Sequence, residues 1–116
     1  MKIAQAENLS SSLSLLADIK GSAGLKIARN KRMIDDELKE YYERKQELFK
    51  KYGTEEGDIL KIDRDSENYP LFMEELKPLM EMEVDFNFRK LMEQELIESG
   101  MTSAQMSLIW EMVDAD

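Results

Sequence analysis

The chain has 116 residues, of which 42% are hydrophobic and 35% are charged, and its formal net charge is -9. That length suits one domain with a single hydrophobic core. Cysteine and histidine are both absent. Disulfides, thiolate metal sites and cysteine nucleophiles are therefore excluded, as are the usual general base and the commonest metal ligand. We predict a protein that is not an enzyme and that has no catalytic residues, metal site or cofactor.

Charge is distributed unevenly along the sequence. Residues 1–52 carry 11 basic and 8 acidic side chains, whereas residues 53–116 carry 5 basic and 17 acidic ones. The acidic half would repel the phosphates of nucleic acid, so we expect a protein partner and no direct nucleic-acid binding. No apolar stretch is long enough to span a membrane, and the first residues lack a secretory signal. We therefore expect a cytoplasmic protein with no membrane partner.

The first predicted helix covers residues 5–19, where leucines recur at helical spacing. The serines between the leucines are expected to face solvent: Ser10, Ser11 and Ser14. Gly21-Ser22-Ala23-Gly24 follows and predicts a linker. A Gly-x-x-Gly turn also occurs in phosphate loops and nucleic-acid clamps, but no strand precedes it here, so the linker is favoured.

The strongest helical pattern covers residues 25–52, which we predict to be one long helix ended by Gly53. Apolar residues and two lysines alternate at spacings of four and three, like the a and d positions of a coiled coil. This seam consists of Ile27, Lys31, Ile34, Leu38, Tyr41, Lys45, Leu48 and Tyr52. A seam of this length needs a partner, which is either another helix of the same chain or a second copy in a homodimer.

Residues 53–68 are predicted to form a polar connector, in which residues 59–62 would either pair as an edge strand or be mobile. Residues 69–82 have one apolar face, which is typical of a helix packed on a core. Pro70 suits the start of that helix, and Pro78 is expected to kink or divide it.

Residues 84–88 alternate between apolar and polar side chains, which predicts a short half-buried strand. Two further helices are predicted over residues 90–98 and 102–113. Thr102 and Gln105 have the spacing of a capping box at the start of the second one. The expected fold is an α-dominated α+β single domain, with one long helix packed against two or three shorter helices and a small β element.

The last predicted helix is apolar on nearly all sides and belongs to a methionine-rich, acidic part of the chain. Such a helix is buried on two sides, either within its own fold or against a partner. Methionine and tryptophan both suit binding surfaces. The predicted partner-binding residues are therefore Met106, Ile109, Trp110 and Val113, together with Glu93, Glu95, Glu98 and Glu111.

Four acidic residues follow the ligand spacing of a calcium loop: Asp63, Asp65, Glu67 and Glu74. Such a loop needs glycine at its sixth position, which is Asn68 here. A solvated acidic loop is therefore the favoured interpretation, and a bound cation is the alternative.

Basic residues gather near the start of the long helix, where the helix dipole disfavours cations: Lys20, Lys26, Arg29, Lys31 and Arg32. This conflict would be explained by an acidic partner or a phosphate. The favoured explanation is that these cations pair with the acidic half of the same chain.

Several short motifs occur in a characteristic order: Gly24-Leu25-Lys26-Ile27-Ala28-Arg29-Asn30, Glu37-Leu38-Lys39-x-Tyr41, Leu48-Phe49-Lys50-Lys51-Tyr52-Gly53, Glu75-Leu76 and Met82-Glu83-Val84-Asp85-Phe86. Their order and spacing resemble a family of small uncharacterised proteins of tailed phages and prophages of Gram-positive bacteria. The resemblance covers nearly the whole chain, and Pro78 and the methionine-rich C-terminal helix depart from it. It implies a phage or prophage origin and action in the cytoplasm of the infected cell, and it brings no catalytic residues.

We therefore expect a phage-encoded protein-binding module that serves as an assembly factor or accessory structural factor. Its partner would be a phage structural protein, and the chain would be cytoplasmic or associated with the virion. The alternative is a small acidic inhibitor of a host nuclease-based defence, of the anti-CRISPR type. In that case the acidic half would occupy a basic nucleic-acid channel of the nuclease.

Overall fold

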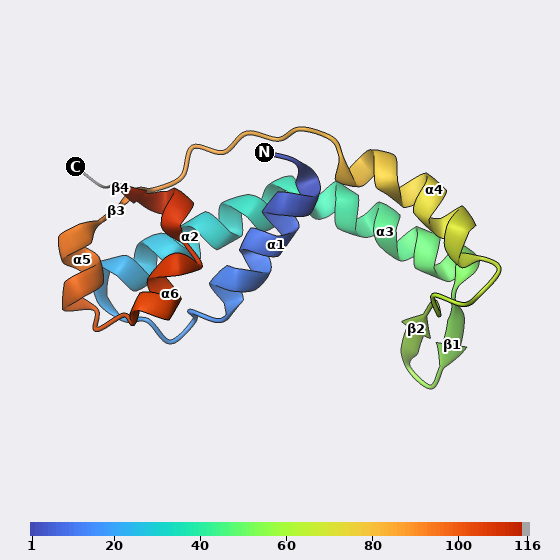
Figure 1. Ribbon diagram of the computed structural model, residues 1–116, viewed down its shortest axis with the longest axis horizontal. Coiled ribbons are helices and arrows are strands. Elements are labelled where there is room, and N and C mark those ends of the chain that lie inside the picture. The colour runs from blue at the N-terminus through green and yellow to red at the C-terminus, as the bar shows by residue number, and fades with distance from the viewer. Residues whose placement is uncertain (115–116) are drawn as a thin grey trace.

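Four helices make up the body of the protein: α1 (Ile3–Ser14), α2 (Gly21–Glu37), α3 (Lys39–Tyr52) and α4 (Tyr69–Met80). The computed structural model describes residues 1–114 and measures 51 × 30 × 21 Å along its principal axes. α2 and α3 follow one another along the long axis, with α1 beside α2 and α4 beside α3 (Figure 1). Helices dominate and the strands are short, which confirms the predicted α-dominated α+β fold.

The helix predicted over residues 25–52 is in fact two helices that meet at Leu38. Backbone hydrogen bonds of 2.9 Å from Leu38 N to Ile34 O and from Tyr42 N to Leu38 O continue across the junction. The chain bends because the first half of the seam packs against α1 and the second half against α4. The spacing of apolar residues is the same whether the seam packs against α1 or against α4. The bend therefore could not be predicted from it.

The seam is covered within the chain. Ile27, Ile34, Leu38 and Tyr41 are all at most 5% exposed, and the later seam residues are partly buried. The intramolecular alternative is therefore the arrangement seen. A homodimer through residues 27–52 would have to displace α1 or α4 from the seam.

Helix α1 starts earlier and ends earlier than the predicted range 5–19. At its start, Lys2 N donates to Gln5 Oε1 over 2.8 Å, which satisfies a backbone donor that the helix leaves free. Ser10 is buried, contrary to the prediction, because its hydroxyl donates to Asp35 of α2 over 2.6 Å. Ser11 and Ser14 are exposed as predicted.

Gly21 and Gly24 belong to the first turn of α2, so the predicted linker over 21–24 is wrong. The connection between α1 and α2 lies over residues 15–20. Gly21 has a φ of +75°, which other residues adopt only with strain. A Cβ on Gly24 would collide with the carbonyl oxygen of Ile19. The two glycines allow the chain to turn tightly into α2.

We expect Gly24→Ala to lower the free energy of unfolding by about 1–3 kcal/mol, because the Ile19 backbone must move to admit a methyl group. This penalty outweighs the gain in helix propensity, which is roughly 1 kcal/mol for alanine over glycine. Urea unfolding followed by circular dichroism measures it. Arg29→Ala, at an exposed position of the same helix, is the control and should change stability by less than about 0.5 kcal/mol. An unchanged midpoint for Gly24→Ala would contradict the close approach.

The connector over residues 53–68 contains a β-hairpin. β1 (Thr54–Glu56) pairs antiparallel with β2 (Ile59–Lys61), and Gly57 turns the chain with a φ of +65°. Of the two alternatives for residues 59–62, pairing as a strand is the one seen. The hairpin projects beyond the ends of α3 and α4 (Figure 1), and Ile59 is 67% exposed.

Residues 81–90 form an extended strap that connects α4 with the C-terminal part of the chain along one edge of the body (Figure 1). The predicted strand over 84–88 is wrong, because within the described chain the strap has only one isolated bridge, between Glu83 and Lys2. The alternation of side chains is as expected, with Val84, Phe86 and Phe88 partly buried and the residues between them exposed. The alternation of apolar and polar residues correctly predicted which side chains face the core. It could not show that no neighbouring strand of the described chain pairs with this segment.

Residues 91–114 form a C-terminal cap beside α2 and α1 (Figure 1). Its elements are β3 (Leu91–Met92), α5 (Glu93–Glu98), α6 (Ser103–Ser107), the single 3-10 turn η1 (Trp110–Met112) and β4 (Val113–Asp114). β3 and β4 pair in parallel, with Leu91 opposite Val113.

The helices predicted over residues 90–98 and 102–113 are thus shorter and interrupted. The capping box is confirmed, because Gln105 N donates to Thr102 Oγ1 over 3.1 Å and Thr102 N donates to Gln105 Oε1 over 2.9 Å. Beyond α6 the chain tightens into a 3-10 turn, which brings Ile109 and Met112 into the core with no exposed surface. One continuous α-helix with two apolar faces would have left one face in solvent.

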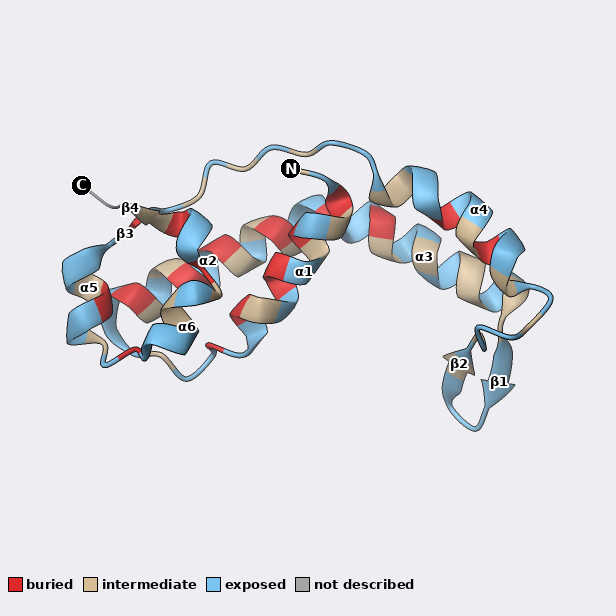
Figure 2. Ribbon diagram, in the orientation of Figure 1, coloured by how far each residue is buried: buried red, intermediate tan, exposed pale blue. Residues whose placement is uncertain are grey.

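Buried residues line the facing sides of the helices and of the cap (Figure 2) and belong to one hydrophobic cluster. Within residues 1–114, no helix combines the length and the apolar character that a membrane span requires.

Candidate partner-binding surface

Trp110 is the single tryptophan of the chain, and 62% of its surface is exposed. Its neighbours Ile109 and Met112 are completely buried, so the backbone on both sides of the indole is anchored in the core. The ring is therefore presented to solvent from a fixed turn. It borders an open hollow of about 450 Å³, which is lined by Ser103, Met106, Ser107 and Trp110. We call this surface the Trp110 hollow.

The structure separates the four apolar residues that the sequence grouped as a binding surface. Met106 and Trp110 line the hollow, whereas Ile109 lies in the core. Val113 is partly buried in β4, where it pairs with Leu91. Ile109 and Val113 are thus unsuited to direct contact with a partner, because their side chains already serve the fold.

The four acidic candidates also separate. Glu93, Glu98 and Glu111 are exposed, and they place negative charge on the cap. Glu95 instead forms an ion pair with Lys26 of α2. Three of the four glutamates are therefore open to a partner, and the fourth fixes the cap to the body.

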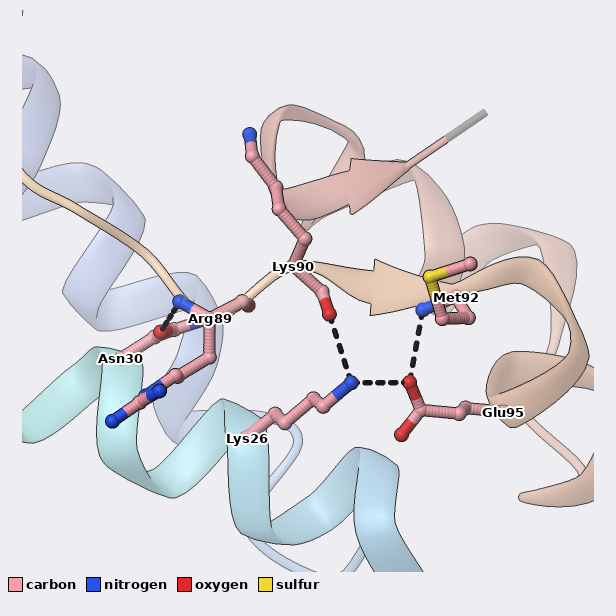
Figure 3. A network of polar contacts seen from close by, with 6 residues as sticks. All are labelled: Lys26, Asn30, Arg89, Lys90, Met92 and Glu95. Carbon is pink, nitrogen blue, oxygen red and sulfur yellow. Dashed lines mark hydrogen bonds and ion pairs between the residues drawn. The ribbon is translucent and has the colours of Figure 1, made fainter. Parts of the chain in front are cut away.

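Lys26 and Glu95 are the centre of a polar network between α2 and the cap (Figure 3). Lys26 Nζ also donates to the carbonyl oxygen of Lys90 over 2.9 Å, and Glu95 accepts from Met92 N over 3.0 Å. The hydrogen bond from Lys26 is the largest cause that lowers the pKa of Glu95 from its ordinary 4.5 to about 2, with further contributions from Ser22 and Met92. The network stabilises the charged form of this carboxylate.

The predicted pairing of the basic residues with the acidic half is thus confirmed for Lys26. Lys31 pairs with Asp35 of its own helix. Among the described residues, Lys20, Arg29 and Arg32 form no ion pair. The sequence predicted attraction between the basic residues and the acidic half. It did not predict which of the five basic residues would form the ion pair.

Because the pKa of Glu95 is depressed in the folded chain, its contribution to stability is present above pH 4.5 and is lost as the pH falls towards 2. We expect Glu95→Gln to remove this contribution. The free energy of unfolding of the variant should therefore fall less steeply than that of the native chain between about pH 5 and pH 2. Thermal unfolding across this range measures the difference. Glu98→Gln, at an exposed position of the same helix, should keep the native pH dependence; equal slopes for all three chains would contradict the prediction.

Asn30 of α2 joins the strap to the body, and its side chain has no exposed surface. Its amide oxygen accepts from Arg89 N over 2.8 Å, and its amide nitrogen donates to Arg89 O over 2.9 Å (Figure 3). The same nitrogen lies 3.3 Å from the sulfur of Met112 in the cap. Asn30 was not among the residues predicted from the sequence to have a role. The signal was present, because Asn30 follows Ile27 by three positions and precedes Ile34 by four, which places it on the buried face.

A second polar cluster joins α1 to α3. Glu7 accepts from Lys45 Nζ over 2.9 Å and from the hydroxyl of Tyr41 over 3.3 Å. Burial, followed by the charge of Glu7, raises the pKa of Tyr41 above its ordinary value of 10. These groups have their partners inside the fold, and their positions are explained by helix packing.

Asp35 joins α2 to α1 in a similar way. Burial alone would raise its pKa, but hydrogen bonds from Lys31 and Ser10 outweigh this effect and lower it. Lys31 Nζ donates over 2.6 Å, as does the hydroxyl of Ser10. The paired form of this carboxylate is therefore the charged one.

The carboxylates that imitated a calcium loop lie at the exposed surface. Asp63, Asp65 and Glu67 belong to the chain before α4, and Glu74 lies on α4. Throughout residues 1–114, no three acidic side chains come close enough together to hold a metal ion.

No family model, no curated protein and no solved structure matches this chain.

Proposed function

We propose that this chain is a protein-binding module encoded by a phage or prophage, that it acts without catalysis, and that Trp110 is its principal contact. The observation that carries the proposal is the 62% exposure of this indole on a turn whose neighbours are buried. Tryptophan is the residue most enriched among the few that dominate binding energy at interfaces. A fixed aromatic side chain also loses little conformational freedom on binding.

The chemistry of the hollow indicates what a partner would present. Met106 and Trp110 provide apolar surface, and the small residues Ser103 and Ser107 leave room between them. An apolar side chain of the partner would fill this space. The exposed Glu93, Glu98 and Glu111 favour a partner whose surface is basic around that side chain. A phage structural protein with such a surface fits the role of an assembly or accessory factor in the host cytoplasm or the virion.

A second candidate function is the inhibition of a host nuclease-based defence. It is favoured by a different observation, namely that the projecting hairpin and the cap both carry exposed acidic residues, among them Glu55, Glu56 and Glu98. Such a surface would suit a basic nucleic-acid channel. The two functions differ in which contacts dominate: an apolar anchor in the first and distributed charge in the second.

Affinity capture from phage-infected host cells, with mass spectrometry of the retained proteins, tests the proposal. We expect the native chain to retain a phage structural protein, and Trp110→Ala to retain little of it. Ile59→Ala is the matched control, because Ile59 is 67% exposed and lies on the hairpin, far from the cap (Figure 1).

Reversal of charge at Glu55 and Glu56 of the hairpin separates the two candidates, because only the nuclease inhibitor uses these residues. A nuclease inhibitor would lose its target on charge reversal and would bind less tightly in salt. If Trp110→Ala and Ile59→Ala retained the same proteins as the native chain, the proposed role of Trp110 would be wrong.

A further inference from the structure

A second surface, which includes no residue of the cap, carries its own features of a binding site. Two hollows of about 440 Å³ and 360 Å³ both include Arg44 and Leu79 in their linings. The two hollows are therefore adjacent along α3, and they are bordered by α4 and by the start of the strap. We call the two together the α3–α4 groove.

Apolar side chains lie among the charged ones along the groove. Leu48 and Leu79 are partly buried, and Val84 of the strap lies at one end. Met82 is 55% exposed at the same end, although its backbone oxygen is held by a 2.9 Å hydrogen bond from Ile3 N. An exposed methionine on a fixed backbone provides an adaptable apolar contact.

The rim of the groove has an excess of negative charge. Lys51 is paired with Glu75 at 3.4 Å, and Glu83 is paired with the N-terminal amine at 3.0 Å. The remaining charged residues of the lining are Glu37, Glu40, Arg44 and Glu47, and none of them forms an ion pair with another described residue. Three acidic side chains therefore accompany one basic side chain along the groove.

We propose that the α3–α4 groove binds a basic amphipathic helix of a partner protein. The apolar face of that helix would lie on Leu79 and Met82, and its lysines or arginines would face Glu40 and Glu47. A helix suits the site because the groove follows the 14 residues of α3, whose rise of about 21 Å matches roughly four turns of a partner helix. Two packed helices with a groove along their junction accept a third helix by the ordinary packing of ridges into grooves.

This surface is distinct from the Trp110 hollow, and each can fail without the other. A fluorescein-labelled peptide of about 18 residues, made only of leucine and lysine with leucine at helical spacing, is the probe. Fluorescence anisotropy measures its affinity for the full chain. We expect this peptide to bind, and a peptide with glutamate in place of lysine not to bind.

Matched variants locate the peptide. Glu40→Gln combined with Glu47→Gln should weaken binding by about tenfold or more, whereas Glu93→Gln combined with Glu98→Gln removes the same charge from the cap and should weaken it far less. Arg44→Glu should strengthen binding several-fold, and Arg29→Glu, which changes the net charge equally outside the groove, should not. Met82→Ser should weaken binding at least about threefold, because it removes apolar contact surface.

The emission of Trp110 identifies binding at the wrong place, since the peptide contains no tryptophan and Trp110 lies in the cap. Binding in the groove leaves this emission unchanged, whereas binding at the Trp110 hollow shifts it to shorter wavelength. The proposal would be overturned if the double variants at Glu40/Glu47 and Glu93/Glu98 weakened peptide binding equally, and if Arg44→Glu and Arg29→Glu changed it equally. The peptide would then bind through nonspecific attraction to an acidic chain. A shift of Trp110 emission with no effect of Met82→Ser would overturn it as well and place the peptide on the cap.

Discussion

Ile109→Ala is expected to lower the free energy of unfolding by about 2–5 kcal/mol, the usual cost of truncating a fully buried isoleucine. Ile109 has no exposed surface and anchors η1 to the core beneath the cap. Trp110→Ala, one residue further along, should change stability by less than about 1 kcal/mol, because most of the indole is in solvent. Urea unfolding monitored by far-ultraviolet circular dichroism compares the two variants directly.

The contrast between these adjacent residues tests the assignment of roles in the cap. The core residue supports the fold, and the exposed residue is free to bind. Equal losses of stability in both variants would mean that the indole is itself part of the core, and the Trp110 hollow would then be wrong as a binding surface.

Asn30→Ala is expected to lower the free energy of unfolding by about 2–4 kcal/mol. The substitution removes both hydrogen bonds to the partly buried backbone of Arg89, each worth roughly 0.5–1.5 kcal/mol, and leaves a cavity where the fully buried Asn30 side chain packed. Asn8→Ala, at an exposed position of α1, is the control and should stay within about 0.5 kcal/mol.

Amide hydrogen exchange locates the effect of Asn30→Ala. The Arg89 amide should be protected in the native chain and exchange much faster in the variant, because its acceptor is the Asn30 side chain. Native-like protection of that amide, together with native-like stability, would contradict the role assigned to Asn30.

The helical part of the fold could be predicted from periodicity, because the residues at seam positions are those that pack against other helices. Ile27, Ile34 and Tyr41 were identified in this way and are buried. The bend at Leu38 could not be predicted, since neither glycine nor proline marks it and the spacing continues through it. The bend is caused by a change of neighbour from α1 to α4, which is a tertiary property.

The candidate site shows a different limit of sequence analysis. A run in which nearly every position is apolar does not reveal which side chain faces solvent. Ile109 and Trp110 were both predicted to bind a partner, and the 3-10 turn directs one inward and the other outward. The strap is a similar case, because alternation along 84–88 indicated the buried side but could not supply a neighbouring strand.

The uneven distribution of charge predicted that basic residues near the start of α2 would meet the acidic half, and Lys26 does so. It could not identify the partner, because Glu95 is 69 positions away and is brought there by the packing of the cap. Lys90 O and Met92 N complete the same network through the backbone, which no side-chain pattern encodes.

The most direct test of the proposed function is the affinity of the captured partner for the native chain, Trp110→Ala and Ile59→Ala, measured by isothermal titration calorimetry. A tryptophan that dominates an interface contributes about 2 kcal/mol or more, which corresponds to a loss of affinity of roughly thirtyfold. We therefore predict a loss of at least that size for Trp110→Ala and none for Ile59→Ala. Equal affinities of all three chains would contradict the claim that this protein binds its partner through Trp110.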